Sequence, residues 1–281
     1  MDKVNSKEGT HTLKVPGASL YYELRGSGPV LLFMPGGPAD AGAFRNIAGH
    51  LQSDYTVVTY DPRGLSHSPL EGPLDDDQIV QVFADDVHRL LAAVTKERAN
   101  VFASSGGATI SLELAARHPE QLATLVPHEI PSPAVMPDPA RRRAEMEDIV
   151  ATYRSSGIGP AMQKFMVHTN IRGGGQPPPQ REPTPEQREA MANMQRNMDF
   201  WLGHYFQAIA DYEPDFDALK KGPVRIVSAV GDESQGELAH EGGVRLAKLL
   251  GSEAVVFPGA HGGFDSDAAD FAKKLKEVLK G

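Results

Sequence analysis

Short apolar runs, rich in β-branched and aromatic residues, alternate with amphipathic stretches along the first 130 residues of this chain. The strand candidates in this part are Leu20–Leu24, Val30–Met34, Tyr55–Tyr60, Asn100–Ser104 and Leu122–Val126. Between the third and fourth of these, apolar residues from Ile79 to Val94 recur at the spacing of one helix face. Strands that alternate with helices are typical of a mostly parallel sheet flanked by helices, so the sequence predicts an α/β fold.

The alternation of strand and helix candidates stops in the middle of the chain and resumes near its C-terminus. Val224–Val230 and Ala254–Phe257 read as strands, whereas residues 131–215 contain no strand candidate. This middle stretch holds the only tryptophan and a Gly- and Pro-rich segment, residues 172–185, which we interpret as a loop. We therefore predict an α/β core of residues 1–130 and 216–281, with a helical cap, or lid, of residues 131–215 inserted into it.

Composition excludes several classes of function. The chain of 281 residues has a net charge of −9, which argues against nucleic acid as a partner, and no cysteine, which excludes thiolate nucleophiles and Cys-ligated zinc. Neither a signal peptide nor a membrane-spanning run is apparent, so we expect a cytoplasmic protein with no membrane partner. No residues have metal-ligand spacing, so we expect a small-molecule substrate and neither metal nor cofactor; the sequence does not specify an oligomeric state.

The segment VFASSGG places a serine at the end of a predicted strand, with small residues directly after it. A nucleophilic serine on a sharp strand-to-helix turn needs small neighbours, because its backbone angles are strained. We predict Ser105 as the nucleophile and the N–H of Gly106 as one donor to the oxyanion. Ser104 is the competing serine, and a phosphate-binding turn is the alternative interpretation of the segment.

A serine hydroxyl becomes a good nucleophile when a histidine takes its proton and an acid orients that histidine. His261 follows the last predicted strand and is the best-placed base, with His128 and His204 as runners-up. Asp232 follows the penultimate strand, so Ser105, Asp232 and His261 form the predicted triad. Glu129 is the alternative acid, because it also follows a predicted strand.

The loop after the second strand candidate, FMPGGPAD, supplies glycines where a second oxyanion donor is needed, and we choose the N–H of Gly37. Substrate selection should come from the predicted cap, whose methionines and aromatic residues could line an adaptable apolar pocket. The pocket candidates are Met166, Trp201, Tyr205 and Phe206.

The PGGP loop, YDPRGLSHS, the ASSGG turn, GDES and GAHGG, in this order, resemble the α/β-hydrolase superfamily. Within it the chain is similar to the capped esterase and proline-iminopeptidase branch, and to esterases that open lactones, including macrolide rings. It departs from the pattern at Ala103, where the turn usually has glycine, at Pro35, where many relatives carry histidine, and at Gly106, where the peptidases usually carry tryptophan.

Together the residues and the resemblance imply a serine hydrolase that cleaves a carboxylic ester or lactone of a bulky, largely apolar molecule through an acyl-enzyme. Two alternatives remain open. The same triad could serve an aminopeptidase, an amidase or a hydrolase of carbon–carbon bonds, or the protein could be a ligand-binding homologue without turnover.

Overall fold

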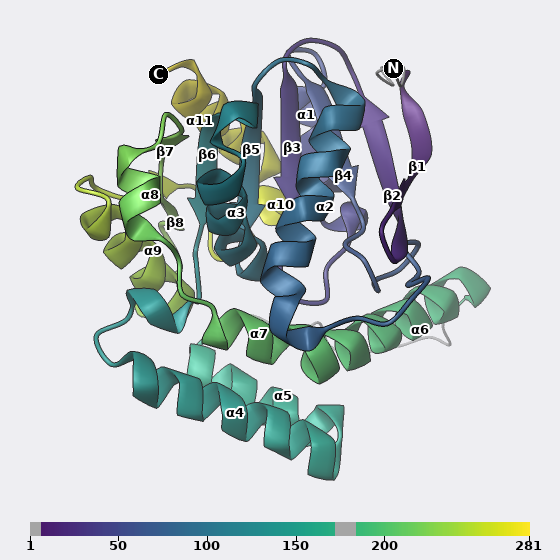
Figure 1. Ribbon diagram of the computed structural model, residues 1–281, viewed down its shortest axis with the longest axis vertical. Coiled ribbons are helices and arrows are strands. Elements are labelled where there is room, and N and C mark those ends of the chain that lie inside the picture. Colours follow the sequence, from purple (N-terminus) through teal and green to yellow (C-terminus); the bar gives the residue numbers. More distant parts are fainter. Residues whose placement is uncertain (1–6, 172–183) are drawn as a thin grey trace.

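A single mixed β-sheet runs through the protein, with helices on both of its faces (Figure 1). The computed structural model describes residues 7–171 and 184–281, so residues 1–6 and most of the Gly- and Pro-rich segment lie outside the described residues. The strands are β1 (Gly9–Val15), β2 (Ala18–Arg25), β3 (Val30–Met34), β4 (Thr56–Tyr60), β5 (Ala99–Ser104), β6 (Leu122–His128), β7 (Arg225–Ile226), β8 (Ala229–Gly231) and β9 (Val255–Phe257).

The α-helices are α1 (Arg45–Leu51), α2 (Ile79–Val94), α3 (Gly106–Arg117), α4 (Pro139–Ser156), α5 (Ile158–Thr169), α6 (Pro185–Phe200), α7 (Phe206–Asp211), α8 (Phe216–Lys221), α9 (Leu238–Leu249), α10 (Gly263–Ser266) and α11 (Ala268–Lys280). Short 3₁₀ turns are η1 (Ala41–Phe44), η2 (Asp76–Gln78), η3 (Pro119–Gln121) and η4 (Pro133–Val135), and η5 (Trp201–Tyr205) is a π-helical turn.

The strand order is β1-β2-β4-β3-β5-β6-β8-β9, with β7 also beside β6. Among the strand pairs of the described residues, β1–β2 and β2–β4 are antiparallel and the others are parallel. The mostly parallel sheet flanked by helices confirms the predicted fold class. Because parallel strands all end at the same edge, the segments after β3, β5, β6, β8 and β9 come together there.

The predicted strands match the observed ones closely, with two differences. β1 was not predicted, since its alternation of exposed and covered residues on an edge strand gives a weak signal. The predicted strand Val224–Val230 is divided into β7 and β8, because the pairing with β6 is interrupted at residues 227–228.

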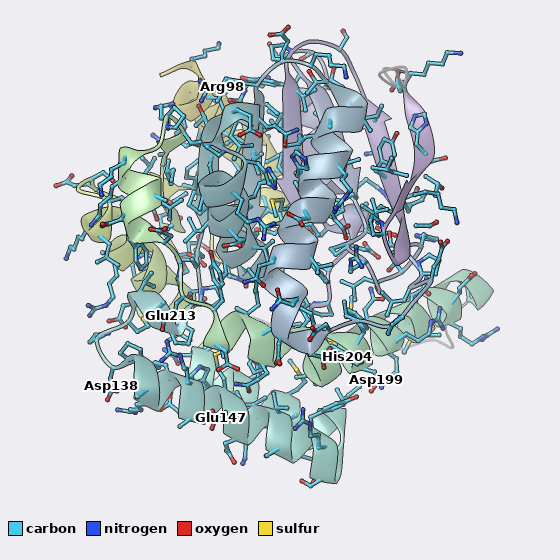
Figure 2. The ribbon with its side chains drawn as sticks, viewed as in Figure 1. Arg98, Asp138, Glu147, Asp199, His204 and Glu213 are labelled. Atoms are coloured by element: carbon cyan, nitrogen blue, oxygen red, sulfur yellow. The ribbon has the colours of Figure 1, made fainter. Side chains whose placement is uncertain are left out.

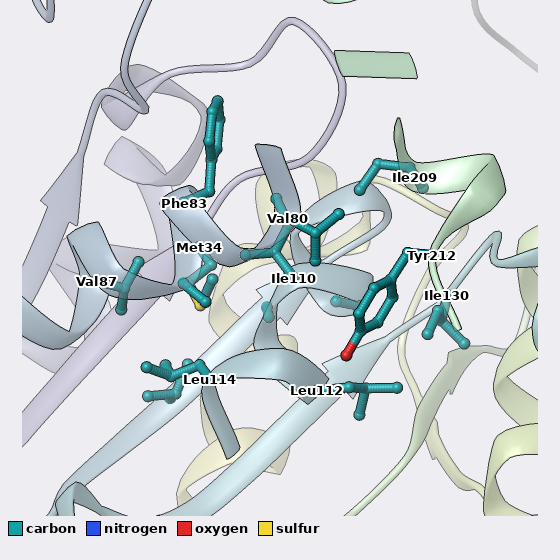
Figure 3. Close-up of a cluster of buried hydrophobic side chains, with 14 of the residues drawn as sticks. Met34, Val80, Phe83, Val87, Ile110, Leu112, Leu114, Ile130, Ile209 and Tyr212 are labelled. Atoms are coloured by element: carbon teal, nitrogen blue, oxygen red, sulfur yellow. The ribbon is translucent and has the colours of Figure 1, made fainter. Parts of the chain in front are cut away.

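Two hydrophobic layers sandwich the sheet. One layer holds α2 and α3 against it through residues such as Phe83, Ile110 and Leu114 (Figure 3). The other packs α1 and α11 on the opposite face, where Phe44, Phe102 and Phe271 meet. The predicted stripe from Ile79 to Val94 is the buried face of α2, which accounts for the strength of its helical pattern.

Helices α4 to α7, with the turn η5, lie beyond one end of the sheet (Figure 1), and we call them the cap helices. They occupy the stretch predicted as a cap, and its described residues contain no strand. Within residues 7–171 and 184–281, none of the helices has the length and apolar character required to span a membrane.

Candidate active site

Ser105 occupies a sharp turn between the end of β5 and the start of α3. Its backbone angles are φ 55° and ψ −125°, in a region that residues other than glycine rarely adopt. The turn is crowded, because a Cβ added to Gly107 would lie 2.4 Å from the carbonyl oxygen of Pro35. The strained serine and its small neighbours have the geometry of a nucleophile at a strand-to-helix turn.

Two backbone amides lie beside this serine. As the first residue of α3, Gly106 has an N–H with no acceptor within its own helix. A Cβ added to Gly106 would lie 3.6 Å from the nitrogen of Gly37, so the two glycines are direct neighbours. Gly37 has a left-handed φ of 58°, which suits glycine at this turn. This pair of amides is the arrangement expected for the predicted oxyanion donors.

His261 is held by Glu129. The Nδ1 atom of His261 lies 2.5 Å from Oε2 of Glu129, whose side chain is completely buried. The other carboxylate oxygen, Oε1, accepts hydrogen bonds from the N–H of Gly231 at 2.9 Å and from the hydroxyl of Ser234. Sequence reasoning missed Ser234, because a serine in a turn carries no signal of a buried partner.

The structure places Glu129, the alternative acid, beside His261 and places the predicted acid, Asp232, against another partner. Asp232 is exposed, and its Oδ1 accepts a hydrogen bond from the N–H of Gly259 at 2.7 Å. Asp232 therefore shapes the turn that leads to His261 and does not contact the imidazole. The alternative acid, Glu129, directly follows β6, whose end is buried beside the serine turn.

The charge on Glu129 is stabilised by its partners. Burial by itself raises the pKa of this carboxyl, but the hydrogen bond from His261, the neighbouring His128 and the hydrogen bond from Ser234 lower it to about 2. Glu129 also has a φ of 52°, so Ser105 and Glu129 are two of the four described non-glycine residues with positive φ. Strain at both positions is typical of a functional site.

The two runner-up histidines have other surroundings. His128 is completely buried within a cage of phenylalanine rings, 6.3 Å from the ring of His261 between centroids, and neither nitrogen has a hydrogen-bond partner among the described residues. Burial lowers the pKa of His128 to about 4, so the ring is neutral at pH 7. His204 is half exposed and lies 2.9 Å from Asp76, in a cap-to-core contact.

Ser105 and His261 line one cavity of about 300 Å³, which Gly37 and Gly106 also reach. Trp201 and Phe206, two of the predicted pocket residues, line it as well. The other two, Met166 and Tyr205, are not among its lining residues. Further cap side chains in its wall are Met146, Met162, Phe165, His168, Met198 and Ile209. The cavity is therefore a largely apolar chamber between the sheet edge and the cap helices.

The position of Tyr205 explains its absence from the cavity wall. Its ring packs against Phe83, with ring centroids 5.3 Å apart, and its hydroxyl would lie 3.1 Å from a Cβ added to Gly106. Tyr205 thus fills the space that a side chain at position 106 would occupy, and it is not part of the cavity wall.

Comparisons with known proteins agree that the chain resembles hydrolases of the alpha/beta hydrolase fold. The alpha/beta hydrolase fold family matches residues 29–148. The chain is 37% identical to the uncharacterized hydrolase YraK of Bacillus subtilis, over 96% of this chain and 95% of that one. It is 25% identical to a zearalenone hydrolase of Bionectria ochroleuca, over 96% and 97% of the two chains.

Solved structures show the same fold. An enol-lactonase from Burkholderia xenovorans is similar with a TM-score of 0.66 and 19% identity, over 96% of this chain and 100% of that one. A membrane phospholipase A, described as a bacterial virulence factor, is similar with a TM-score of 0.73 and 24% identity, over 97% and 86% of the two chains.

Proposed function

Because the chain belongs to the α/β-hydrolase fold family, we propose that it is a serine hydrolase that cleaves a carboxylic ester or lactone of a bulky, largely apolar molecule. The observation that carries the proposal is the contact between His261 and the buried carboxylate of Glu129, at a cavity that the strained Ser105 shares. The zearalenone hydrolase among the relatives and the enol-lactonase among the structural neighbours support a lactone as the substrate.

In the proposed acylation step, Nε2 of His261 takes the proton from the hydroxyl of Ser105 as its oxygen attacks the substrate carbonyl. Glu129 accepts the Nδ1–H of the ring, which fixes the tautomer and stabilises the imidazolium that forms. The N–H groups of Gly37 and Gly106 donate to the oxyanion. When the tetrahedral intermediate collapses, the carbon–oxygen bond breaks and the leaving oxygen takes the proton from His261.

Deacylation repeats these steps with water as the nucleophile. His261 removes a proton from water, hydroxide adds to the acyl carbon, and the oxygen of Ser105 leaves with the proton returned by His261. A simple ester thus yields an acid and an alcohol. A lactone yields one hydroxy acid, because its leaving oxygen stays attached to the acyl group.

The lining of the cavity supports a substrate with a bulky, apolar acyl or ring portion. Its wall is built from aliphatic, aromatic and methionine side chains of the cap helices, and methionine adapts to irregular ligands. We propose that the cap helices form a lid unit over the core, which covers this substrate portion and shields its apolar surface from bulk solvent.

The experiment that tests the proposal treats the folded protein with a fluorophosphonate probe and measures hydrolysis of p-nitrophenyl esters of increasing acyl size. We expect the probe to modify Ser105, and the Ser105→Ala variant to lose both the labelling and roughly 10⁴-fold or more of the turnover rate. Ser104→Ala is the matched control and should keep both. Labelling elsewhere, or hydrolysis that survives in Ser105→Ala, would exclude the serine mechanism; a preference for acetate esters would exclude the bulky substrate.

A further inference from the structure

We propose that Asn197, on cap helix α6, is a positioning residue that holds the oxyanion loop, residues 35–40, in its active shape. This inference rests on the proposed serine hydrolase function. It adds that the oxyanion site is assembled partly by the cap, so that the position of the cap helices controls the rate of the chemical step.

The side chain of Asn197 is almost completely buried, with 2% exposure, and its hydrogen-bond partners among the described residues belong to core segments. Its Nδ2 donates to the carbonyl oxygen of Pro38 at 3.0 Å and to Oγ of Ser66 at 2.9 Å. Its Oδ1 accepts from the N–H of Ser66 at 2.9 Å. Both donor hydrogens and the acceptor are used, so the amide fixes the distance between the helix and these two loops.

The oxyanion loop depends on such external support. It is built from prolines and glycines, and Gly37 takes its left-handed turn directly before Pro38. Within the loop, the N–H of Ala39 donates to the carbonyl oxygen of Gly36 at 3.2 Å. An oxyanion donor must be placed to within a fraction of an ångström, so a bond to the carbonyl of Pro38 acts on the residue next to the donor itself.

A second contact secures the far end of the same loop. The hydroxyl of Ser66 donates to Oδ2 of Asp40 at 2.6 Å, and Ser66 has a strained φ of 43°. A strained backbone persists where its surroundings fix it, and Asn197 binds both the N–H and the hydroxyl of this residue. Asn197 therefore reaches the oxyanion loop directly at Pro38 and indirectly, through Ser66, at Asp40.

Neighbouring residues on the same helical segment touch the substrate cavity. Met198 and Trp201 line it, and Trp201 would lie 4.0 Å from a Cβ added to Gly37. A substrate that fills the cavity therefore contacts the helix segment that holds the oxyanion loop. The geometry couples the fit of the substrate to the placement of the Gly37 N–H, which favours turnover of substrates that seat the cap correctly.

Steady-state hydrolysis of a p-nitrophenyl ester by the full-length protein tests this coupling in Asn197→Ala and Asn197→Asp. Aspartate keeps an acceptor for the N–H of Ser66 but cannot donate to Pro38, so both variants lose the direct bond. We expect kcat to fall roughly 10- to 100-fold with KM changed less than about twofold. Binding of a trifluoromethyl ketone, which mimics the tetrahedral intermediate at Ser105, should weaken by the same factor as kcat/KM.

His204→Ala is the matched control. His204 (Figure 2) lies in the turn η5, directly after α6, and its ring bonds to Asp76 in η2 instead of to the oxyanion loop or Ser66. Its loss should leave kcat unchanged. Ser66→Ala removes only the indirect route and should cost less than Asn197→Asp.

The proposal is overturned if the folded Asn197→Asp variant keeps kcat within about twofold of the parent. It is equally overturned if His204→Ala loses kcat in parallel, since general loosening of the cap would then explain both. Should Asn197→Ala not fold, the near-isosteric Asn197→Asp decides alone. Ser105→Ala separates the two hypotheses, because hydrolysis that survives in that variant contradicts the serine mechanism whatever the Asn197 variants do.

Discussion

The ends of strands β6 and β8 each carry a carboxylate, yet only one of them meets His261. Glu129, after β6, is completely buried and surrounded by hydrogen-bond donors, whereas Asp232, after β8, is exposed and bonds to a backbone N–H. Two acids that each directly follow a strand of the sheet therefore differ in their environment. The difference shows that the tertiary surroundings of a strand end, more than its place in the sequence, determine which acid contacts the histidine.

The β8 end in fact supports the β6 end. Gly231, the last residue of β8, donates its N–H to Oε1 of Glu129, and Ser234 in the following turn donates its hydroxyl to the same oxygen. A Cβ added to Gly231 would lie 2.3 Å from the carbonyl oxygen of Gly259, so the two turns are in close contact. The turn that carries Asp232 thus supplies donors to the buried acid and supports the histidine loop.

The largest expected effect comes from neutralising Glu129, and the same change at Asp232 serves as the comparison. Glu129→Gln removes the buried negative charge that stabilises the imidazolium and permits the wrong tautomer, so kcat/KM should fall by about 10³–10⁴. Asp232→Asn keeps an acceptor for Gly259 and should change kcat/KM by less than about threefold, as for other exposed substitutions. Parallel measurements of ester hydrolysis by the two variants provide the comparison.

The reverse ranking would contradict the assignment of Glu129. If Asp232→Asn lost most of its activity while Glu129→Gln did not, His261 would have to exchange partners during turnover. Fluorophosphonate labelling of both variants, with thermal unfolding as a check on folding, distinguishes a lost charge from a lost fold.

A smaller effect is expected from Ser234→Ala, which removes one donor to the buried carboxylate. The pKa of Glu129 should rise, because the hydrogen bond from Ser234 is one of the causes that lower it. We expect a loss of about 1.4 kcal/mol of stability at neutral pH and a fall of about tenfold in kcat/KM. Denaturant unfolding and ester hydrolysis measure the two quantities.

Ser228→Ala provides a matched control for this change. Its hydroxyl is also buried near the end of β6, but it donates to the carbonyl oxygen of Gly243 at 2.7 Å and does not contact Glu129. It should lose similar stability and keep its activity. Equal losses of activity in the two variants would show that the Ser234 contact has no role beyond packing.

Most of the fold could be predicted from the sequence, because long periodic segments such as α2 and fully buried strands such as β3 carry strong patterns. β1 is the strand that could not be predicted from the sequence. It is an edge strand with few buried residues, and its place is fixed by pairing with β2 instead of by its own composition.

The candidate site divides in the same way. Ser105 and His261 could be found from local motifs, because a nucleophile turn demands small neighbours and the histidine follows the last strand. The acid could not be chosen reliably, since both candidates follow strands and their burial depends on distant segments. Asn197 gave no signal at all, because its two partner residues, Ser66 and Pro38, lie about 130 and 160 residues away along the chain.

The smallest expected effect on turnover concerns His128, which makes the β6 end sensitive to acid. The unfolded chain binds a proton at this residue below about pH 6.5, whereas burial delays protonation in the folded state until about pH 4. Protons therefore favour the unfolded state, and stability should fall by roughly 3 kcal/mol as the pH drops from 6.5 to 4. His128→Phe, whose ring suits the surrounding phenylalanines, should abolish this part of the dependence of stability on pH and leave ester hydrolysis at pH 7 within about twofold of the parent.

Denaturant unfolding across this pH range measures the slope of stability against pH, and the exposed His50→Gln variant should keep that slope. If His128→Phe retained the parent slope, the acid sensitivity would have to come from another group, and the contrast between a buried β6 end and an exposed β8 end would rest on Glu129 alone.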